Sequence, residues 1–232
     1  MSQQPFTDPQ RELLEELLRA GAVLIGDVVR ARFGLQSPIY FDLREALYSR
    51  PELLWKVGRE FAEKICELAR ANPVPQCVVG IPDTATPLAL ATALYSWQNR
   101  KLTGGPEIFY ALLRKEGKTY PGLPTSYWVG KKDAGGCEYN LIDDVLASGL
   151  TKRAAASRMQ QEGVTVRRIV VLFDRQQGDG LRSEGFDVHG IFPVPDVLDF
   201  YLERKLISAE DRERIGRFLL TRRFDVTAVR GE

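Results

Sequence analysis

Residues 141–151 read Leu-Ile-Asp-Asp-Val-Leu-Ala-Ser-Gly-Leu-Thr, and this stretch decides the fold class and the candidate site. An apolar strand leads into two acids at its solvent-facing end, a short loop of small residues and the start of a helix. Asp143 and Asp144 alone would fit an ordinary acidic helix cap. The loop favours a phosphate site, because Ser148, Gly149 and Thr151 offer hydroxyl and backbone N–H groups at a helix N-terminus, where the helix dipole attracts anions. The adjacent carboxylates can reach ribose hydroxyls or Mg²⁺-bound water.

Short apolar runs alternate with helical patterns on both sides of this stretch. Strands are predicted at residues 77–81, 108–113, 139–142, 166–173 and 188–194, with helices at 87–97 and 151–161. Such alternation is typical of an α/β fold with a mainly parallel central sheet flanked by helices. Because ligands of such sheets bind beyond the carboxyl ends of the strands, the site is expected at that edge.

Both ends of the chain read as helical. Thr7 starts a capping box for a helix over 7–21, and the run 51–70 carries apolar residues at helical spacing. Ser208 and Asp211 can cap a last helix. We therefore expect a single domain over 1–232, composed of a smaller N-terminal helical hood over about 1–72, an α/β core over about 75–195 and C-terminal helices over about 196–232.

Charge and cysteine content exclude several classes of protein. The 32 basic and 31 acidic residues nearly cancel, whereas a protein that binds duplex nucleic acid needs a net positive field, so no nucleic-acid partner is expected. The three cysteines show no CxxC spacing, which argues against a zinc knuckle or a disulfide framework and suits a cytoplasmic protein. No run of about 18 apolar residues could span a bilayer, so no membrane association is expected. His189 is the only histidine, so a Ser-His-Asp catalytic triad is not expected.

Four further stretches extend the pattern of residues 141–151. Residues 33–44 read FGLQSPIYFDLR, 79–82 read VGIP with Pro87-Leu88-Ala89 following, 113–120 read LRKEGKTY, and 172–176 read LFDRQ. Their order and spacing over about residues 10–200 resemble the type I phosphoribosyltransferases and, among these, the orotate phosphoribosyltransferase family. The resemblance implies the fold of that class. It also implies an enzyme that transfers the phosphoribosyl group of phosphoribosyl pyrophosphate to orotate, giving orotidine monophosphate and pyrophosphate in pyrimidine nucleotide synthesis.

The resemblance places phosphoribosyl pyrophosphate along the acid pair and the loop that follows it. Asp143 and Asp144 would act in catalysis by holding the ribose hydroxyls and Mg²⁺, which is the implied cofactor. The 5′-phosphate of this substrate would lie in the loop formed by Ala147, Ser148, Gly149, Leu150 and Thr151.

The cations of residues 113–120 would face the leaving group. Arg114, Lys115 and Lys118 would bind pyrophosphate, because positive charge around the departing oxygens stabilises the transition state. Lys118 would also be catalytic, and the family implies a homodimer in which its loop reaches the partner's site. Without the resemblance, three cations after a strand could equally form a solvated edge. The glycine-rich polar insertion 119–136 suits a lid that excludes water.

The resemblance also predicts the residues that bind the base, which are Arg32, Tyr40, Phe41, Ala147 and Arg175. Arg175 would bind a carboxylate on the base, because the planar fork of a guanidinium suits that group. The alternative is that Arg175 only pairs with its acidic neighbour in the sequence or caps a helix.

Four positions depart from the family's usual pattern. Arg32 stands in place of lysine, Asp83 in place of tyrosine, Ala147 in place of threonine and Leu150 in place of a small hydroxyl residue. Asp83 would repel pyrophosphate unless Mg²⁺ lies between them. Ala147 lacks a hydroxyl that would face the base. Two alternatives therefore stay open: a phosphoribosyltransferase that acts on a different base, and a non-catalytic nucleotide-sensing regulator with the same fold.

Overall fold

A six-stranded sheet forms the centre of the protein, whose computed structural model describes residues 5–26, 37–119, 121–122, 125–132, 136–177 and 180–221. The strands run in the order β5-β4-β3-β6-β7-β8. Their bounds are Gln76–Gly80 for β3, Ile108–Lys118 for β4, Ser126–Val129 for β5, Glu138–Leu146 for β6, Val166–Asp174 for β7 and Val188–Pro193 for β8. All neighbouring strands are parallel except β4 and β5. The predicted α/β fold with a mainly parallel sheet is confirmed.

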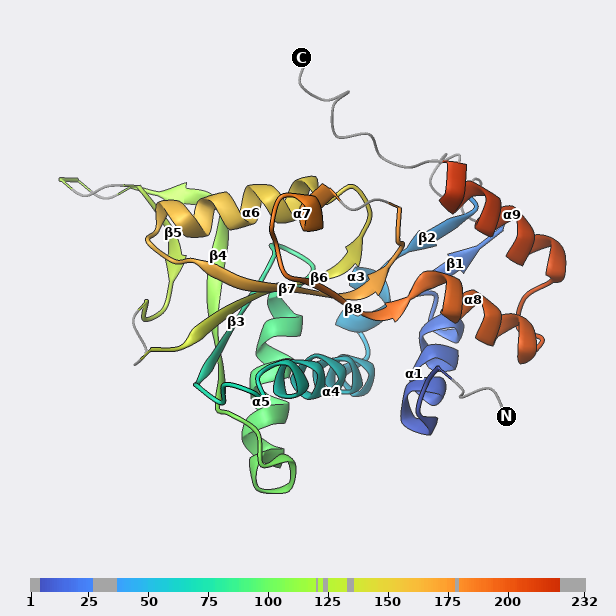
Figure 1. Ribbon diagram of the computed structural model, residues 1–232, viewed down its shortest axis with the longest axis horizontal. Coiled ribbons are helices and arrows are strands. Elements are labelled where there is room, and N and C mark those ends of the chain that lie inside the picture. The colour runs from blue at the N-terminus through green and yellow to red at the C-terminus, as the bar shows by residue number, and fades with distance from the viewer. Residues whose placement is uncertain are drawn as a thin grey trace, which may run out of the picture.

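Helices cover both faces of this sheet (Figure 1). On one face lie α4 (Pro51–Leu68) and α5 (Thr86–Thr103), and on the other lie α6 (Leu150–Gln161) and the short α7 (Gly180–Ser183). Successive residues of a strand point to opposite faces. Val78 of β3 therefore packs into the apolar cluster shared with α4 and α5, whereas its two neighbours pack into the cluster beneath α6.

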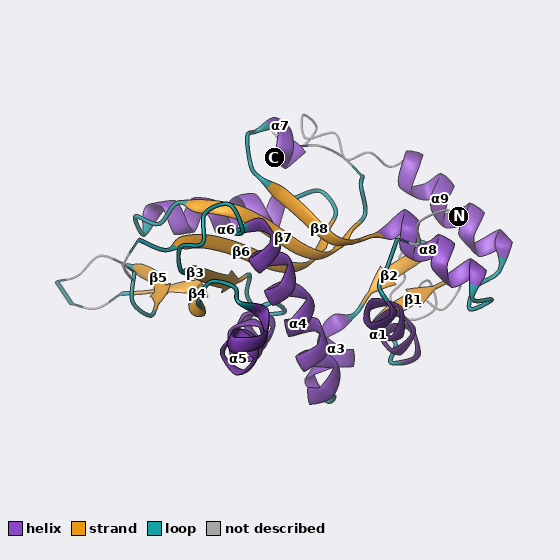
Figure 2. Ribbon diagram, turned by 60° about the horizontal axis from the view of Figure 1, so that its bottom comes forward, coloured by secondary structure: helices purple, strands orange, loops and turns teal. Residues whose placement is uncertain are grey.

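The N-terminal segment and the last two helices gather at one end of the sheet (Figure 2). These elements are α1 (Asp8–Arg19), β1 (Val23–Ile25), β2 (Ile39–Phe41), α3 (Leu43–Tyr48), α8 (Val194–Glu203) and α9 (Ala209–Thr221). β1 and β2 pair antiparallel. The hydroxyl of Tyr201 in α8 donates a 2.8 Å hydrogen bond to the carbonyl of Leu14 in α1, which joins the two ends of the chain. Across the described residues, every helix is too short or too polar to cross a membrane.

Two helix starts follow the predicted capping chemistry. The N–H of Thr7 donates to the side chain of Gln10 at 3.1 Å as part of a capping box before α1. Before α9, the N–H of Asp211 donates to the hydroxyl of Ser208 at 3.0 Å. These contacts satisfy groups that a helix start leaves without partners, so both helices begin where the sequence predicts.

The edge of the sheet beside β4 differs from the expectation. The apolar pattern ends β4 at residue 113, whereas the strand runs to Lys118 and pairs with β5 inside the insertion 119–136. Trp128 of β5 accounts for this, because its side chain is buried and packs edge-on against Tyr139 with ring centroids 5.8 Å apart. The insertion therefore contains an edge strand in addition to the residues expected to form a lid.

Candidate functional site

The sheet reverses its strand order between β3 and β6, and such reversals are where parallel sheets bind ligands. β4 lies on one side of β3, whereas β6 returns to the other side. The loop 81–85 follows β3 and the loop 147–149 follows β6, so both loops open at the same edge of the sheet. The N–H of Ile81 donates to the carbonyl of Ile142 at 3.1 Å, which ties the first loop to β6.

Each loop packs closely on its surroundings because it contains or follows a glycine. A Cβ on Gly80 would lie 2.0 Å from the carbonyl oxygen of Ala85, so the loop after β3 could not fold back over any other residue. Gly149 has a φ of 79°, and its Cβ would lie 2.8 Å from the side chain of Leu181. Because Gly149 directly precedes α6, the small-residue loop lies at the positive end of that helix, where an anionic phosphate is favoured.

The two acids of the pair lie in different environments. Asp143 is buried, with 8% of its side chain exposed, and forms an ion pair with Lys152 of α6. Asp144 is half-buried, and its carboxylate accepts a 2.7 Å hydrogen bond from the N–H of Val145. The expectation that both acids lie at a solvent-facing strand end is wrong for Asp143, because β6 continues to Leu146 and α6 packs over it.

The charge of Asp144 is poorly compensated. Burial, followed by the neighbouring charge of Asp143, raises the pKa of Asp144 to about 7, although Lys152 offsets part of this effect. Within the described residues, no three His, Cys, Asp or Glu side chains come together to hold a metal ion. Mg²⁺ that is shared with substrate phosphates needs only one or two carboxylates from the protein. A cation beside Asp144 would offset the cost of burying the negative charge of that side chain. The acid pair therefore fits a cation shared with a substrate better than a cage made by the protein alone.

The three predicted pyrophosphate cations have different neighbours. Arg114 donates from Nη1 to the carbonyl of Trp128 at 3.1 Å, so its guanidinium binds the backbone of β5. Lys115 lies 3.5 Å from Asp83, measured from Nζ to Oδ2, and both side chains are exposed. Lys118 is exposed at the end of β4. Lys115 is thus joined by an ion pair to the loop after β3.

Two aromatic contacts and a buried guanidinium lie near the end of β7. The rings of Phe41 in β2 and Phe173 in β7 lie 4.6 Å apart. Arg175 follows β7, and its Nε and Nη2 are buried without a hydrogen-bond partner. Its Cζ lies 5.6 Å from the ring centroid of Phe218 in α9, and burial lowers the pKa of Arg175 to about 10. The carboxylate of Asp174 pairs instead with Arg182 at 2.9 Å, against the alternative that Arg175 bridges its acidic neighbour.

Comparison with protein-family models gave no match, but individual relatives are informative. The chain is 32% identical over 190 residues to the orotate phosphoribosyltransferase of Thermoplasma acidophilum, covering 81% of this chain and 97% of that protein. This chain belongs to the orotate phosphoribosyltransferase family. It is also 36% identical over 188 residues to the uridine 5′-monophosphate synthase of Bos taurus, covering 80% of this chain but only 36% of that longer protein. The UMP synthase structure from Leishmania donovani matches with a TM-score of 0.69 at 25% identity, covering 90% of this chain and 42% of that one.

The remaining predicted residues can now be placed within this orotate phosphoribosyltransferase fold. Tyr40 lies beside Phe41 in β2, and both are half-buried. Ala147 is half-buried in the loop before α6, and Leu150, at the start of that helix, is exposed. Arg32 lies outside the described residues.

Two residues outside the predicted set contact the site of this family member. Lys152 pairs with Asp143 from the buried face of α6, and the sequence carries a signal for it, because Lys152 leads the helical stripe of Ala155, Ala156 and Met159. Phe218 carries no such local signal. Its contact with Arg175 depends on how α9 packs against the end of the sheet.

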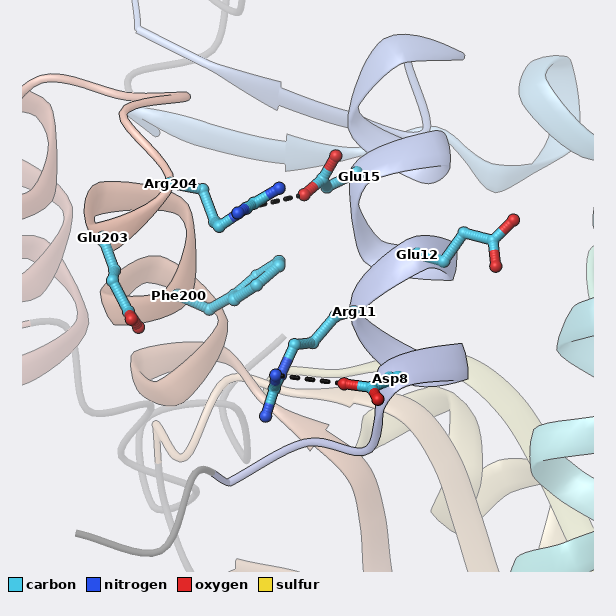
Figure 3. A pocket seen from close by; sticks show the side chains of 7 residues that line it. All are labelled: Asp8, Arg11, Glu12, Glu15, Phe200, Glu203 and Arg204. Atoms are coloured by element: carbon cyan, nitrogen blue, oxygen red, sulfur yellow. Dashed lines mark hydrogen bonds and ion pairs between the residues drawn. The ribbon is translucent and has the colours of Figure 1, made fainter. Parts of the chain in front are cut away.

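A separate hollow of about 400 Å³ lies between α1 and α8 (Figure 3). Its lining residues are Asp8, Arg11, Glu12, Glu15, Phe200, Glu203 and Arg204. Both arginines already pair within it, Arg11 with Asp8 at 3.2 Å and Arg204 with Glu15 at 2.9 Å. None of its residues belongs to the strand-end site, so the site of this family member is assigned to the switch point of the sheet.

Proposed function

We propose that this protein transfers the phosphoribosyl group of phosphoribosyl pyrophosphate to orotate, giving orotidine monophosphate and pyrophosphate. The observation that carries this proposal is the guanidinium of Arg175, whose Nε and Nη2 are buried without hydrogen-bond partners. Phe173, two residues earlier on β7, packs its ring against that of Phe41. A flat base with a carboxylate would place its anionic group on the guanidinium and its ring against the half-buried Phe41. The family of the chain supports the same reaction.

The phosphoribosyl side of the site has a complementary arrangement. The 5′-phosphate is assigned to the loop from Ala147 to Thr151, where the N-terminus of α6 favours an anion. Asp144 is assigned to the ribose hydroxyls and to Mg²⁺, because its half-buried charge lacks compensation. When bound, Mg²⁺ would neutralise part of the pyrophosphate charge.

The chemistry then requires the C1′–oxygen bond to pyrophosphate to break while a base nitrogen forms a bond to C1′ and releases its proton to solvent. Positive charge develops at the ribose ring and negative charge on the leaving oxygens. Lys115 and Lys118 are assigned to those oxygens, and Lys115 must exchange Asp83 for pyrophosphate as the substrate binds. The exchange would explain why aspartate stands at position 83 in place of the family's tyrosine. Between turnovers, the carboxylate of Asp83 would hold Lys115 at the loop.

We also propose a homodimer, as the family resemblance implies, with the loop around Lys118 reaching the partner's site. Three apolar side chains of α5, Leu90, Leu94 and Trp97, are exposed at helical spacing, with 77% of Trp97 exposed. An apolar stripe of this kind on a surface helix supports burial against a second chain.

The test is a panel of bases supplied with phosphoribosyl pyrophosphate and Mg²⁺, with pyrophosphate release and the nucleotide product measured together. Orotate should be used with a kcat/KM at least about 100-fold above that of uracil, because uracil leaves the guanidinium of Arg175 without a partner. Turnover of another base with orotate inert would overturn the assignment in favour of a different phosphoribosyltransferase, for which Ala147 is the supporting departure. Binding of phosphoribosyl pyrophosphate without turnover of any base would favour the nucleotide-sensing regulator.

A further inference from the structure

The buried face of α6 begins with a charged residue. Lys152 is 4% exposed and occupies the first position of the stripe that continues through Ala155, Ala156 and Met159 onto the sheet. Its ammonium forms the ion pair with Asp143 and also donates to the carbonyl of Val145. A single side chain of the phosphate-loop helix is thus bonded to β6 immediately before and immediately after Asp144.

Neither partner of this pair could stay charged in the interior alone. A buried carboxylate or ammonium without a counter-ion is strongly destabilising, and removing one partner of such a pair costs much more than replacing both by packed neutral groups. Asp143 is therefore held by Lys152 from inside the protein. Asp144 accepts a hydrogen bond from the N–H of Val145, and its carboxylate also contacts that of Asp143. Lys152 pairs with Asp143 and offsets only part of the charge on Asp144.

We propose that Lys152 is a positioning residue that divides the acid pair into an anchor and a working carboxylate. Lys152 neutralises Asp143 and fixes β6 to α6, so that only Asp144 acts on the ribose and on the shared cation. The acid pair thereby presents about one negative charge to an anionic substrate where two would repel it. This inference rests on the proposed binding of phosphoribosyl pyrophosphate, but not on the identity of the base.

The test measures binding of phosphoribosyl pyrophosphate with Mg²⁺ by calorimetry, together with the thermal midpoint of each variant. Lys152→Met should lower the thermal midpoint, raise the Kd for this ligand at least tenfold and raise the Mg²⁺ concentration needed, because Asp143 then adds an unpaired charge beside Asp144. Adding Asp143→Asn to Lys152→Met should restore the midpoint and bring the Kd within about threefold of the original. Asp144→Asn in the otherwise unchanged chain should lose binding without any such rescue.

Contrary results separate the proposal from simpler roles. If the folded double variant binds at least 100-fold more weakly than the original protein, Asp143 itself acts on the substrate and the proposal fails. If Lys152→Met lowers only the thermal midpoint and leaves the Kd and the Mg²⁺ requirement unchanged, Lys152 is merely structural and the proposal also fails. A second neutral pair, Asp143→Leu with Lys152→Met, repeats the test with apolar groups. Failure of both neutral pairs to fold would contradict an anchor that works only by pairing.

The binding assay also keeps this inference distinct from the proposed function. It uses no base, so a protein that proves inactive toward orotate still reports whether Lys152 governs the ligand and the cation. The original protein could turn over orotate while the double variant fails to bind phosphoribosyl pyrophosphate. That result would leave the proposed function intact and overturn the division of the acids.

Discussion

Replacing Arg175 should make the ligand-free protein more stable and the enzyme less selective. The Nε and Nη2 of Arg175 are buried without partners, and burial lowers its pKa from 12.5 to about 10. A lowered pKa in a basic group means that the folded state binds the proton less tightly than the unfolded state. The charged guanidinium therefore destabilises the ligand-free fold at every pH below about 10, by about 3 kcal/mol.

The variant Arg175→Leu removes this cost but also removes the contact with the ring of Phe218, which contributes about 1 kcal/mol. The net gain of about 2 kcal/mol corresponds to a thermal midpoint that is about 4–8 °C higher for a chain of this size. A bound carboxylate would lose a charged hydrogen-bond partner worth about 1.5–3 kcal/mol. We therefore expect the preference for orotate over uracil to fall about 10- to 150-fold, with binding of phosphoribosyl pyrophosphate unchanged.

The measurements are a thermal melt without ligands and kcat/KM for both bases. Arg204→Leu is the matched control, because Arg204 makes an exposed ion pair with Glu15 and its loss should change both quantities little. A lower midpoint together with an unchanged preference for orotate would refute the reasoning and make Arg175 a structural residue.

Four further variants test separate parts of the site. Asp144→Asn should lower kcat at least about 100-fold while leaving the thermal midpoint equal or higher, because it removes a poorly compensated charge whose pKa burial raises to about 7; near-normal turnover would contradict the ribose assignment. Lys118→Ala should lower kcat more than it changes the KM for phosphoribosyl pyrophosphate in steady-state assays, whereas a pure KM effect would make Lys118 a ground-state binder. Phe218→Leu should weaken selection of orotate over uracil about three- to tenfold by freeing the guanidinium of Arg175, with the exposed neighbour variant Leu220→Ala as a silent control. Trp97→Glu should shift the protein from dimer to monomer in sedimentation experiments, and an unchanged mass would exclude the α5 stripe as the dimer contact.

Local patterns in the sequence were sufficient for the elements and loops that surround the site. The stretch 141–151 predicts a strand, a small-residue loop and a helix start, and all three are present because each depends on neighbouring residues alone. The capping box that begins at Thr7 is confirmed for the same reason. Local patterns could not locate the end of β4. The charged residues at that end stay in the strand because they pair with β5, and Trp128 of β5 is buried by distant parts of the chain.

Several contacts of the candidate site join segments that are far apart in the sequence, and local patterns could not predict them. Phe41, Phe173 and Phe218 come from the hood, the sheet and the last helix, and no spacing in the sequence relates them. The burial of Lys152 is a different case. Its place at the head of an apolar stripe predicts an inward side chain, but lysine is so seldom buried that only the packed structure and its acidic partner make that reading compelling.

The charges of Asp144 and Arg175 are held by different contacts within the site. Asp144 lies in β6 and Arg175 directly follows the neighbouring strand β7, where its N–H donates to the carbonyl of Leu146 at 3.1 Å. Asp143 and Lys152 are the charged neighbours that act on Asp144, whereas burial alone lowers the pKa of Arg175. The ring of Phe218 holds the guanidinium on one side, while the backbone of Val145 holds the carboxylate on the other. In the proposed reaction the cation and the ribose would meet Asp144 and the anionic base would meet Arg175, so phosphoribosyl pyrophosphate would lie toward β6 and the base toward the end of β7.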